Sequence, residues 1–301
     1  MKSYGFIFIL IFSEIFDKII TKLLQNKEIK DMQNIKALLN TTVCISLMIL
    51  LLAGQSYALV DPENIAVIWL FEEGSGDMVK DLSGNGNDAE LNGQEWADGK
   101  FGKGLQFEPN QNVKSLTAKG LSATYMSETL WVKFDKNFSG IENQFGFISC
   151  TGTPSARYFY FSSWVNGGPH SGIHLGTLDT AGAWGRGISV PAGVFKEGQW
   201  YHVGGVINNE EGSIRAYVDG ELRHEQKFAV GDTPGKPSEI WAGSAPEAGK
   251  SIIGLIDEVA FFNVVLTEDD INKIMDKGLA PEDVNLRGKL TTTWGGIKSA
   301  E

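Results

Sequence analysis

The sequence predicts an all-β protein in which two antiparallel sheets pack as a sandwich, with one short helix near the C-terminus. Three observations support this prediction. Many short apolar or alternating segments recur between turn signals, and none of them has a long helical period. The 301 residues include 36 glycines, which suits a chain with many tight turns. One segment, residues 198–222, holds strand, turn, strand, turn and strand in a single run.

This run predicts an antiparallel meander. An apolar stretch at 200–207 is followed by a polar turn at 208–212, and a strand with one apolar face follows at 214–218. Asp219 and Gly220 come next, and this pair favours a two-residue type I′ turn, because both central residues of that turn need positive φ. His202 lies in the first strand, and we interpret it as a structural histidine rather than a catalyst.

Further strands are expected on both sides of the meander. They are predicted at residues 66–71, 104–107, 113–116, 129–134, 145–150, 158–164, 172–178, 240–242 and 252–262. A helix is predicted to begin after Thr267, because Asp270 lies three residues further on and completes an Asp version of the capping box. Gly278 is expected to end this helix. Cys150 is interpreted as a free core cysteine, with an intermolecular disulfide as the alternative.

Residues 1–58 are predicted to be a signal region that does not belong to the fold. An apolar core at 43–53 precedes Ser56 and Ala58, which are small residues at the spacing of a signal-peptidase site, so we expect cleavage after Ala58. Met32 begins a compact n-region and is predicted to be the true start. The alternative is an uncleaved membrane anchor, although the two apolar stretches of this region, residues 4–16 and 43–53, are shorter than a span of about 20 residues. The folded domain is then 59–280, and residues 281–301 form a tail or linker.

The charge balance narrows the range of partners. The formal net charge is −11, and no basic stripe is present, which excludes nucleic acid as the expected partner. Contact with a membrane is expected only if the N-terminal segment stays uncleaved. The signal region indicates a secreted or cell-surface location.

Four segments resemble the LamG-like family of concanavalin A-type jelly rolls. They are the opening strand and loop at 69–76, the Gly- and Asn-rich turn at 81–88, the meander with Trp-Tyr-His-Val and Tyr-Val-Asp-Gly, and the final strand at 254–263. The resemblance spans about residues 65–278. It implies a two-sheet jelly roll that is secreted, that mostly binds glycans or proteins, and that often carries calcium and no catalytic site. Family members with a C-terminal disulfide have paired cysteines that this chain lacks.

The loop at 81–88 is a candidate calcium site, because it is dense in oxygen-bearing side chains and calcium takes six to eight oxygen ligands. The first and last strands of a jelly roll commonly pair, which adds a carboxylate from each. The candidate metal ligands are Glu72, Asp81, Asn85, Asn87 and Asp257. In the alternative interpretation the loop only makes turns, in which Asp and Asn bond their own backbone.

Residues 164–187 form the candidate ligand-binding region. Aromatic rings suit the faces of sugars, charged and polar groups suit hydroxyls or carboxylates, and glycine lets a ligand approach the backbone closely. The candidate residues are Trp164, His170, Trp184 and Arg186. Alternatively, the two tryptophans only cover the ends of the sandwich.

The sequence offers no catalytic motif. Asp257 and Glu258 are adjacent in a predicted strand, and adjacent strand residues point to opposite faces, so we expect that they cannot flank one glycosidic bond. The Glu-x-Asp-x-x-Glu motif of β-glucanases with this fold is also absent. We therefore expect a non-catalytic binding module for glycans or extracellular proteins, with calcium as the candidate cofactor. The alternatives are a glycoside hydrolase and a purely structural or adhesive domain.

Overall fold

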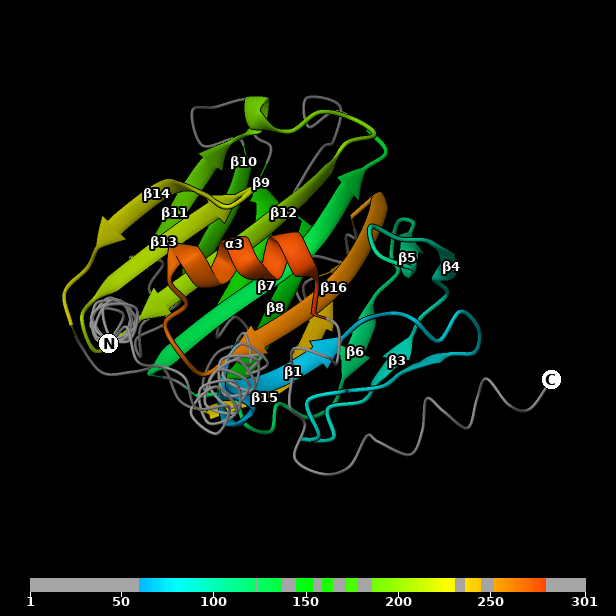
Figure 1. Cartoon of the computed structure of the whole chain (residues 1–301), viewed down its shortest axis with the longest axis horizontal. Helices are drawn as coiled ribbons and strands as arrows, with labels where there is room; N and C mark the ends of the chain where they lie inside the picture. The colour runs from blue at the N-terminus through cyan, green and yellow to red at the C-terminus, as the bar shows by residue number, and fades with distance from the viewer. Residues whose placement is uncertain are drawn as a thin grey trace, which may run out of the picture. The chain divides into compact units, whose positions relative to one another are not determined.

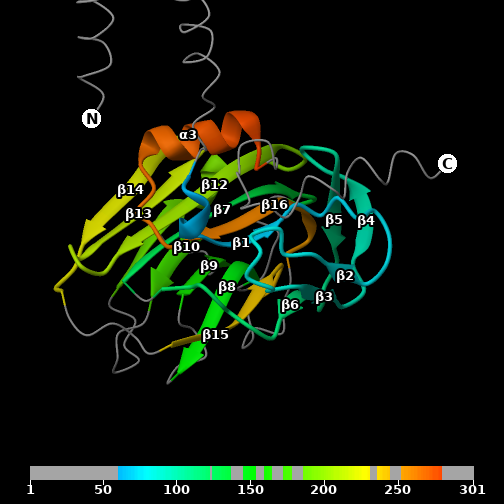
Figure 2. The same cartoon turned by 60° about the horizontal axis from the view of Figure 1, so that its bottom comes forward.

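The computed structural model describes residues 60–122, 124–136, 145–153, 159–164, 172–177, 186–230, 236–244 and 252–279. All of them belong to one compact unit, Ala58–Glu301. Two antiparallel sheets face each other, and one helix lies on the outer side of the first sheet (Figure 1, Figure 2). The predicted sandwich with one C-terminal helix is therefore confirmed. The predicted signal region 1–58 and the tail 281–301 lie outside the described residues.

The first sheet, sheet A, has β7 and β16 at its centre and charged β14 at one edge. Its order is β14 (Glu221–Lys227), β13 (Ser213–Val218), β12 (Trp200–Asn208), β7 (Tyr125–Phe134), β16 (Gly254–Phe262), β5 (Lys103–Phe107) and β4 (Glu95–Asp98), and β1 (Ile65–Trp69) also pairs with β16. The first and last strands of the domain are thus neighbours. A 3₁₀ turn, η1 (Pro62–Asn64), leads into β1.

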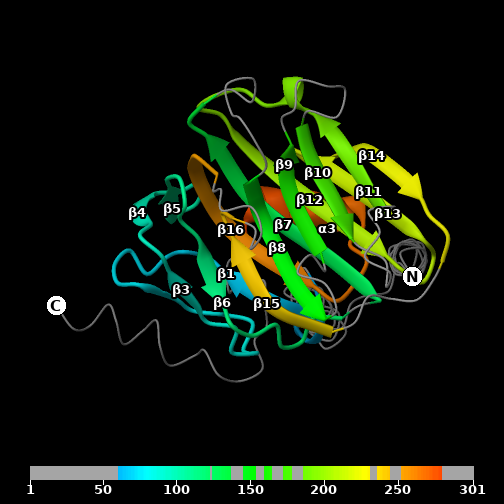
Figure 3. The same ribbon diagram turned by 180° about the vertical axis from the view of Figure 1, so that it is seen from behind.

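The second sheet, sheet B, lies behind sheet A in Figure 1 and in front of it in Figure 3. Its order is β11 (Arg186–Pro191), β10 (Gly172–Thr177), β9 (Phe159–Trp164), β8 (Phe145–Thr153), β15 (Lys236–Ala242), β6 (Val113–Ser115), β3 (Ala89–Leu91) and β2 (Met78–Val79). A 3₁₀ turn, η3 (Ala192–Val194), follows β11. The sequence patterns did not indicate β2, β3, β4 and β11. The first three of these strands have two to four residues and therefore carry little periodicity.

The core lies between the two sheets and is rich in aromatic side chains. Its largest fully buried members include Trp69, Phe107, Phe134, Phe147 and Phe261. A second apolar cluster joins the outer face of sheet A to the helix α3 (Glu268–Lys277) and includes residues of β1, β13 and β16. Both faces of β16 are therefore covered, and each of its residues is buried.

Helix α3 forms as the sequence predicts. Thr267 Oγ1 accepts a hydrogen bond from the Asp270 amide, and the Asp270 carboxylate accepts one from the Thr267 amide, so the capping box is complete. Ile271 and Ile274 are buried against sheet A, and Gly278 ends the helix with a φ of 73°. No helix among the described residues combines the length and the apolar character that a membrane crossing needs.

Two further local predictions are confirmed. Asp219 and Gly220 join β13 to β14 with φ values of 51° and 77°, as a type I′ turn requires. Cys150 on β8 is a free cysteine that is fully buried in the core. Burial also raises the pKa of its thiol, so the thiolate is strongly disfavoured.

Candidate functional site

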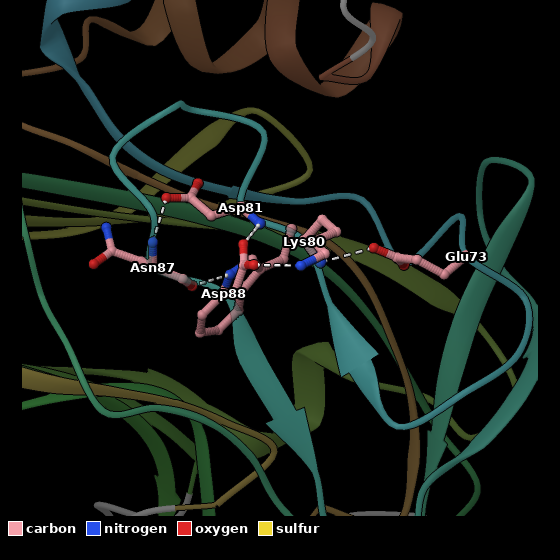
Figure 4. A network of polar contacts seen from close by, with 6 residues as sticks. Glu73, Lys80, Asp81, Asn87 and Asp88 are labelled. Carbon is pink, nitrogen blue, oxygen red and sulfur yellow. Dashed lines mark hydrogen bonds and ion pairs between the residues drawn. The ribbon is translucent and has the colours of Figure 1, made fainter. Parts of the chain in front are cut away.

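The loop at 81–88 is organised around the carboxylate of Asp81. Oδ1 of Asp81 accepts hydrogen bonds from the amides of Ile68 at 3.1 Å and Ser83 at 3.0 Å, and Oδ2 accepts one from the amide of Asn87 at 2.9 Å. Asp81 therefore closes the turn onto its own backbone and onto β1. Figure 4 shows the bond between Asp81 and Asn87 together with the neighbouring Asp88.

The side chain of Asn87 joins the same loop to a second segment. This side chain is fully buried. Its Nδ2 donates to the carbonyls of Ala66 at 3.1 Å and Lys119 at 2.9 Å, and its Oδ1 accepts from the Lys119 amide at 2.8 Å and from Thr117 Oγ1 at 3.0 Å. Asn85 Nδ2 adds a bond to the Ala66 carbonyl at 3.0 Å. The two asparagines therefore hold β1 and the segment after β6 in place.

The outer part of the loop is an exposed charged network. Lys80 Nζ lies 2.6 Å from Asp88 Oδ2, while Asp88 Oδ1 accepts from the Asp81 amide at 2.9 Å. Glu73 accepts from the Lys80 amide at 2.8 Å (Figure 4). These bonds fix the loop next to β1.

The other two candidate ligands, Glu72 and Asp257, lie next to the turn between β4 and β5. Asp257 is fully buried, and its Oδ2 accepts from the amides of Lys100 at 2.8 Å and Phe101 at 2.9 Å. Exposed Glu72 accepts from the Lys103 amide at 3.1 Å. Each carboxylate thus binds the backbone of this turn.

Asp257 and Glu258 do not follow strand alternation, so that premise of the sequence argument is wrong at this point. Glu258 has a φ of 50°, and the pairing of β16 with β7 shifts register between Asp257 and Ala260. Both side chains are buried, and Glu258 Oε2 accepts from the Leu279 amide at 2.5 Å. Burial, with a smaller contribution from the negative charge of Glu72, raises the pKa of each carboxyl to about 7.

The five candidate metal ligands thus fall into two groups with separate backbone partners. Among the residues that the structure describes, no group of three or more His, Cys, Asp or Glu side chains is arranged to hold a metal ion. The contacts of Asp81, Asn85 and Asn87 are those expected of a loop that makes turns and ties strands together. The donors as they stand do not form a cation cage, and calcium binding stays a prediction.

Two of the candidate ligand-binding residues, Trp164 and Arg186, lie beside opposite ends of strand β10 in sheet B. Trp164 ends β9, where its backbone pairs with Gly172 at the start of β10. Arg186 begins β11 and pairs with Thr177 at the other end of β10. Five residue steps along a strand separate these positions by about 17 Å. His170 and Trp184 lie outside the described residues, as do the side chains of Trp164 and Arg186.

An ordered aromatic group on the outer face of sheet B was not predicted. Trp241 on β15 is half-buried, and its Nε1 donates to Glu239 Oε2 at 3.2 Å. Lys114 Nζ on β6 lies 4.5 Å from the centroid of the Trp241 ring and 3.2 Å from Glu239 Oε1. The alternation of the strand could have indicated this position. Ile240 and Ala242 are buried in the core, and side chains alternate along a strand, so Trp241 lies on the opposite face.

The same outer face carries further polar groups. Thr151 and Ser238 are hydrogen-bonded through their hydroxyls at 2.9 Å beside Glu239, and His174 on β10 is bonded to Ser189 on β11 at 3.0 Å. Helix α3 covers the outer face of sheet A, whereas Figure 3 shows no described element over this face of sheet B. An aromatic ring next to hydroxyl and charged groups can bind a polar ligand, and His174 lies three strands away from Trp241 on the same face.

His202 is buried, as expected for a structural residue, but it is not fully hydrogen-bonded. Its ring lies 5.2 Å from the Trp131 ring, and its Nδ1 has no hydrogen-bond partner. Burial, and then the charge of Lys100, lower its pKa to about 3, so the imidazole is neutral.

Comparisons with known proteins agree with this architecture. Residues 108–272 match a family model described as the concanavalin A-like lectin/glucanases superfamily. Comparison with curated protein sequences finds no match. Among solved structures, domain 4 of AbnA, a GH43 extracellular arabinanase from Geobacillus stearothermophilus in complex with arabinotriose, is similar with a TM-score of 0.52 and 17% identity over 70% of this chain and 98% of that domain.

Toxin binding domains are also similar in structure. The ligand-binding domain of botulinum neurotoxin serotype D in complex with N-acetylneuraminic acid has a TM-score of 0.55 and 17% identity over 72% of this chain and 51% of that one. The binding domain of Paraclostridial Mosquitocidal Protein 1 has a TM-score of 0.56 and 14% identity over 71% and 52%. The chain therefore spans about half the length of these toxin domains. At such identities the likeness shows the fold.

Proposed function

The chain belongs to the concanavalin A-like lectin/glucanase superfamily, since the matched residues make up more than half of it, and we propose that it is a secreted, non-catalytic module that binds glycans or surface proteins. Two structural neighbours support the glycan part of the proposal, because their structures hold arabinotriose and N-acetylneuraminic acid. The fold is also used by hydrolases, so the site must carry the argument.

The observation that carries the proposal is the Trp241 group on sheet B, formed by Trp241, Lys114 and Glu239. Glu239 holds the edge of the indole and the Lys114 ammonium at the same time, which fixes the ring before a ligand arrives. A fixed ring loses little conformational entropy on binding, and this favours affinity. The ring also stands on a rigid strand rather than on a loop.

A glycan array probed with the purified protein tests the proposal, with Trp241→Ala as the site variant. We expect binding to at least one glycan class and a loss of affinity of about tenfold or more in the variant. Trp200→Ala is the matched control, because Trp200 also has a lysine over its ring but lies on sheet A. Equal losses in both variants would place the site elsewhere, and an array without any binding would favour a structural or adhesive role.

The environment of the carboxylates on β16 supports the proposal that the protein is not catalytic. Asp257 and Glu258 are adjacent acids, but both are buried and both accept hydrogen bonds from backbone amides. Neither is free to protonate a glycosidic oxygen as these contacts stand. Release of reducing sugar from any glycan that binds would contradict this part.

We also propose, independently of the glycan site, that the protein depends on calcium. The mutual repulsion of Glu72, Asp257 and Glu258 supports it, because a divalent cation near them would relieve that repulsion. Such a cation would have to displace the backbone amides that now bind Asp257. A melting temperature and a glycan affinity that are both unchanged by a chelator would remove calcium from the proposal.

A further inference from the structure

Glu128 is a carboxylic acid in the core of the sandwich. It lies on β7 at an exposed fraction of 0%, between Met126 and Leu130, which point into the same core. Neither of its carboxyl oxygens has a hydrogen-bond partner. A buried carboxylate without a partner is strongly unfavourable, because nothing replaces the water that solvates its charge. The neutral acid is the form that this site tolerates.

The surroundings of Glu128 come from both sheets. Gly205 on β12 is its neighbour in sheet A, and a Cβ atom at Gly205 would lie 3.2 Å from Glu128 Oε1 and 2.8 Å from a methyl carbon of Leu175 in sheet B. The carboxyl group therefore occupies space that is free because residue 205 has no side chain, and this space lies next to the opposite sheet. A larger residue at 205 would collide with both groups.

The described residues around Glu128 supply no positive charge. Gly205 on β12, Leu175 on β10 and Phe261 on β16 are uncharged, and Cys150 on β8 is the titratable neighbour. The charge of Glu128 raises the pKa of the Cys150 thiol, so the two groups lie close enough to interact. Burial alone raises the pKa of Glu128 well above its usual value.

We propose that Glu128 is a proton-dependent lock between the two sheets: the sandwich packs closed while this side chain is a neutral acid, and it loosens when the acid ionises, because the charge has no partner in either sheet. The folded chain then keeps one proton at pH values at which the unfolded chain has lost it. Ionisation of Glu128 therefore costs the fold nothing below about pH 4.3, the value for an unfolded glutamate, and the fold loses stability as the pH rises from there toward the raised pKa of the folded state. The lock does not depend on the proposed ligand site.

Denaturant unfolding of the full chain and of Glu128→Gln at several pH values tests the proposal. Glutamine keeps the size of the side chain and removes its titration. We expect the unfolding constant of the unsubstituted protein, divided by that of the variant, to rise up to tenfold per pH unit between about pH 5 and pH 8. Glu90→Gln is the matched control, because Glu90 is exposed on β3, and its ratio should stay constant. A constant ratio for Glu128→Gln as well would overturn the proposal.

A second measurement covers the case in which Glu128→Gln does not fold. Carbon NMR of glutamate labelled at the side-chain carboxyl reports each acid in the unsubstituted protein. We expect one carboxyl carbon to keep the shift of a protonated acid above pH 7, where Glu258, with its pKa of about 7, has begun to ionise. A spectrum in which every glutamate is ionised at pH 8 excludes the lock and leaves the proposed glycan binding untouched.

Discussion

Replacing Asn87 with alanine tests whether the loop at 81–88 is a hydrogen-bonded hub of the fold. The fully buried amide makes four hydrogen bonds, to Ala66, Thr117 and twice to Lys119. Truncation of the side chain removes all four hydrogen bonds and leaves their partners without these bonds at a site that water does not reach. The variant should therefore fold less stably, whether or not calcium is present.

The expected loss follows from these bonds. The Ala66 carbonyl keeps Ser83 and Asn85 as donors, so that loss is small. The other three bonds hold the segment after β6, and at a net value of about 1 kcal/mol each they sum to about 3 kcal/mol. For a domain of this size, 1 kcal/mol lowers the melting temperature by about 2–4 °C, which gives a fall of about 6–12 °C.

Thermal unfolding followed by circular dichroism measures this fall, once with calcium and once with a chelator. Asn92→Ala serves as the control, because Asn92 is exposed and should change stability by less than about 0.5 kcal/mol. A fall of less than about 2 °C in Asn87→Ala would refute the reasoning from hydrogen bonds. A fall that is seen only with calcium would show that Asn87 acts as a ligand instead.

Three further predictions concern single residues. Gly220→Ala should lower stability by about 1 kcal/mol or more, seen in the denaturation midpoint, because φ is 77° and the new methyl group would overlap with the Asn272 side chain. With Cys44 replaced by serine, Cys150 should react with a thiol reagent only in denaturant, and labelling of the native protein would contradict its burial. Burial lowers the pKa of His202 to about 3, so its contribution to stability should be lost as the pH falls from about 6.5 toward 3. His202→Gln should lack that pH dependence in denaturant titrations, and an unchanged dependence would show that another group titrates.

The sequence could predict those features that depend on a few neighbouring residues. The turn at Asp219 and Gly220 needs two residues that accept positive φ, and this requirement is local. The capping box of Thr267 and Asp270 is equally local, since both partners lie within one helical turn. The alternation of the meander then places these elements on a sheet with one face in the core.

The carboxylates of β16 show what the sequence could not predict. Alternation puts Asp257 and Glu258 on opposite faces, but the irregularity in the pairing with β7 breaks that alternation. Such a bulge depends on contacts with strands that are distant in the chain, including the turn at Lys100 and Phe101 that Asp257 binds. A pattern read along a single strand contains no information about those contacts.

The prediction of the candidate ligand-binding residues was limited in the same way. Trp164 and Arg186 lie in one glycine-rich region of the sequence, yet the length of β10 separates their backbone positions. The oxygen-rich loop is likewise engaged by backbone donors that belong to β1 and to the segment after β6. Trp241 differs from both, because its own strand holds it in place and its indole has a fixed partner in Glu239. A binding site on this face would therefore be formed by side chains that the folding of the sandwich already orders, whichever way the loops at the ends of the strands are arranged.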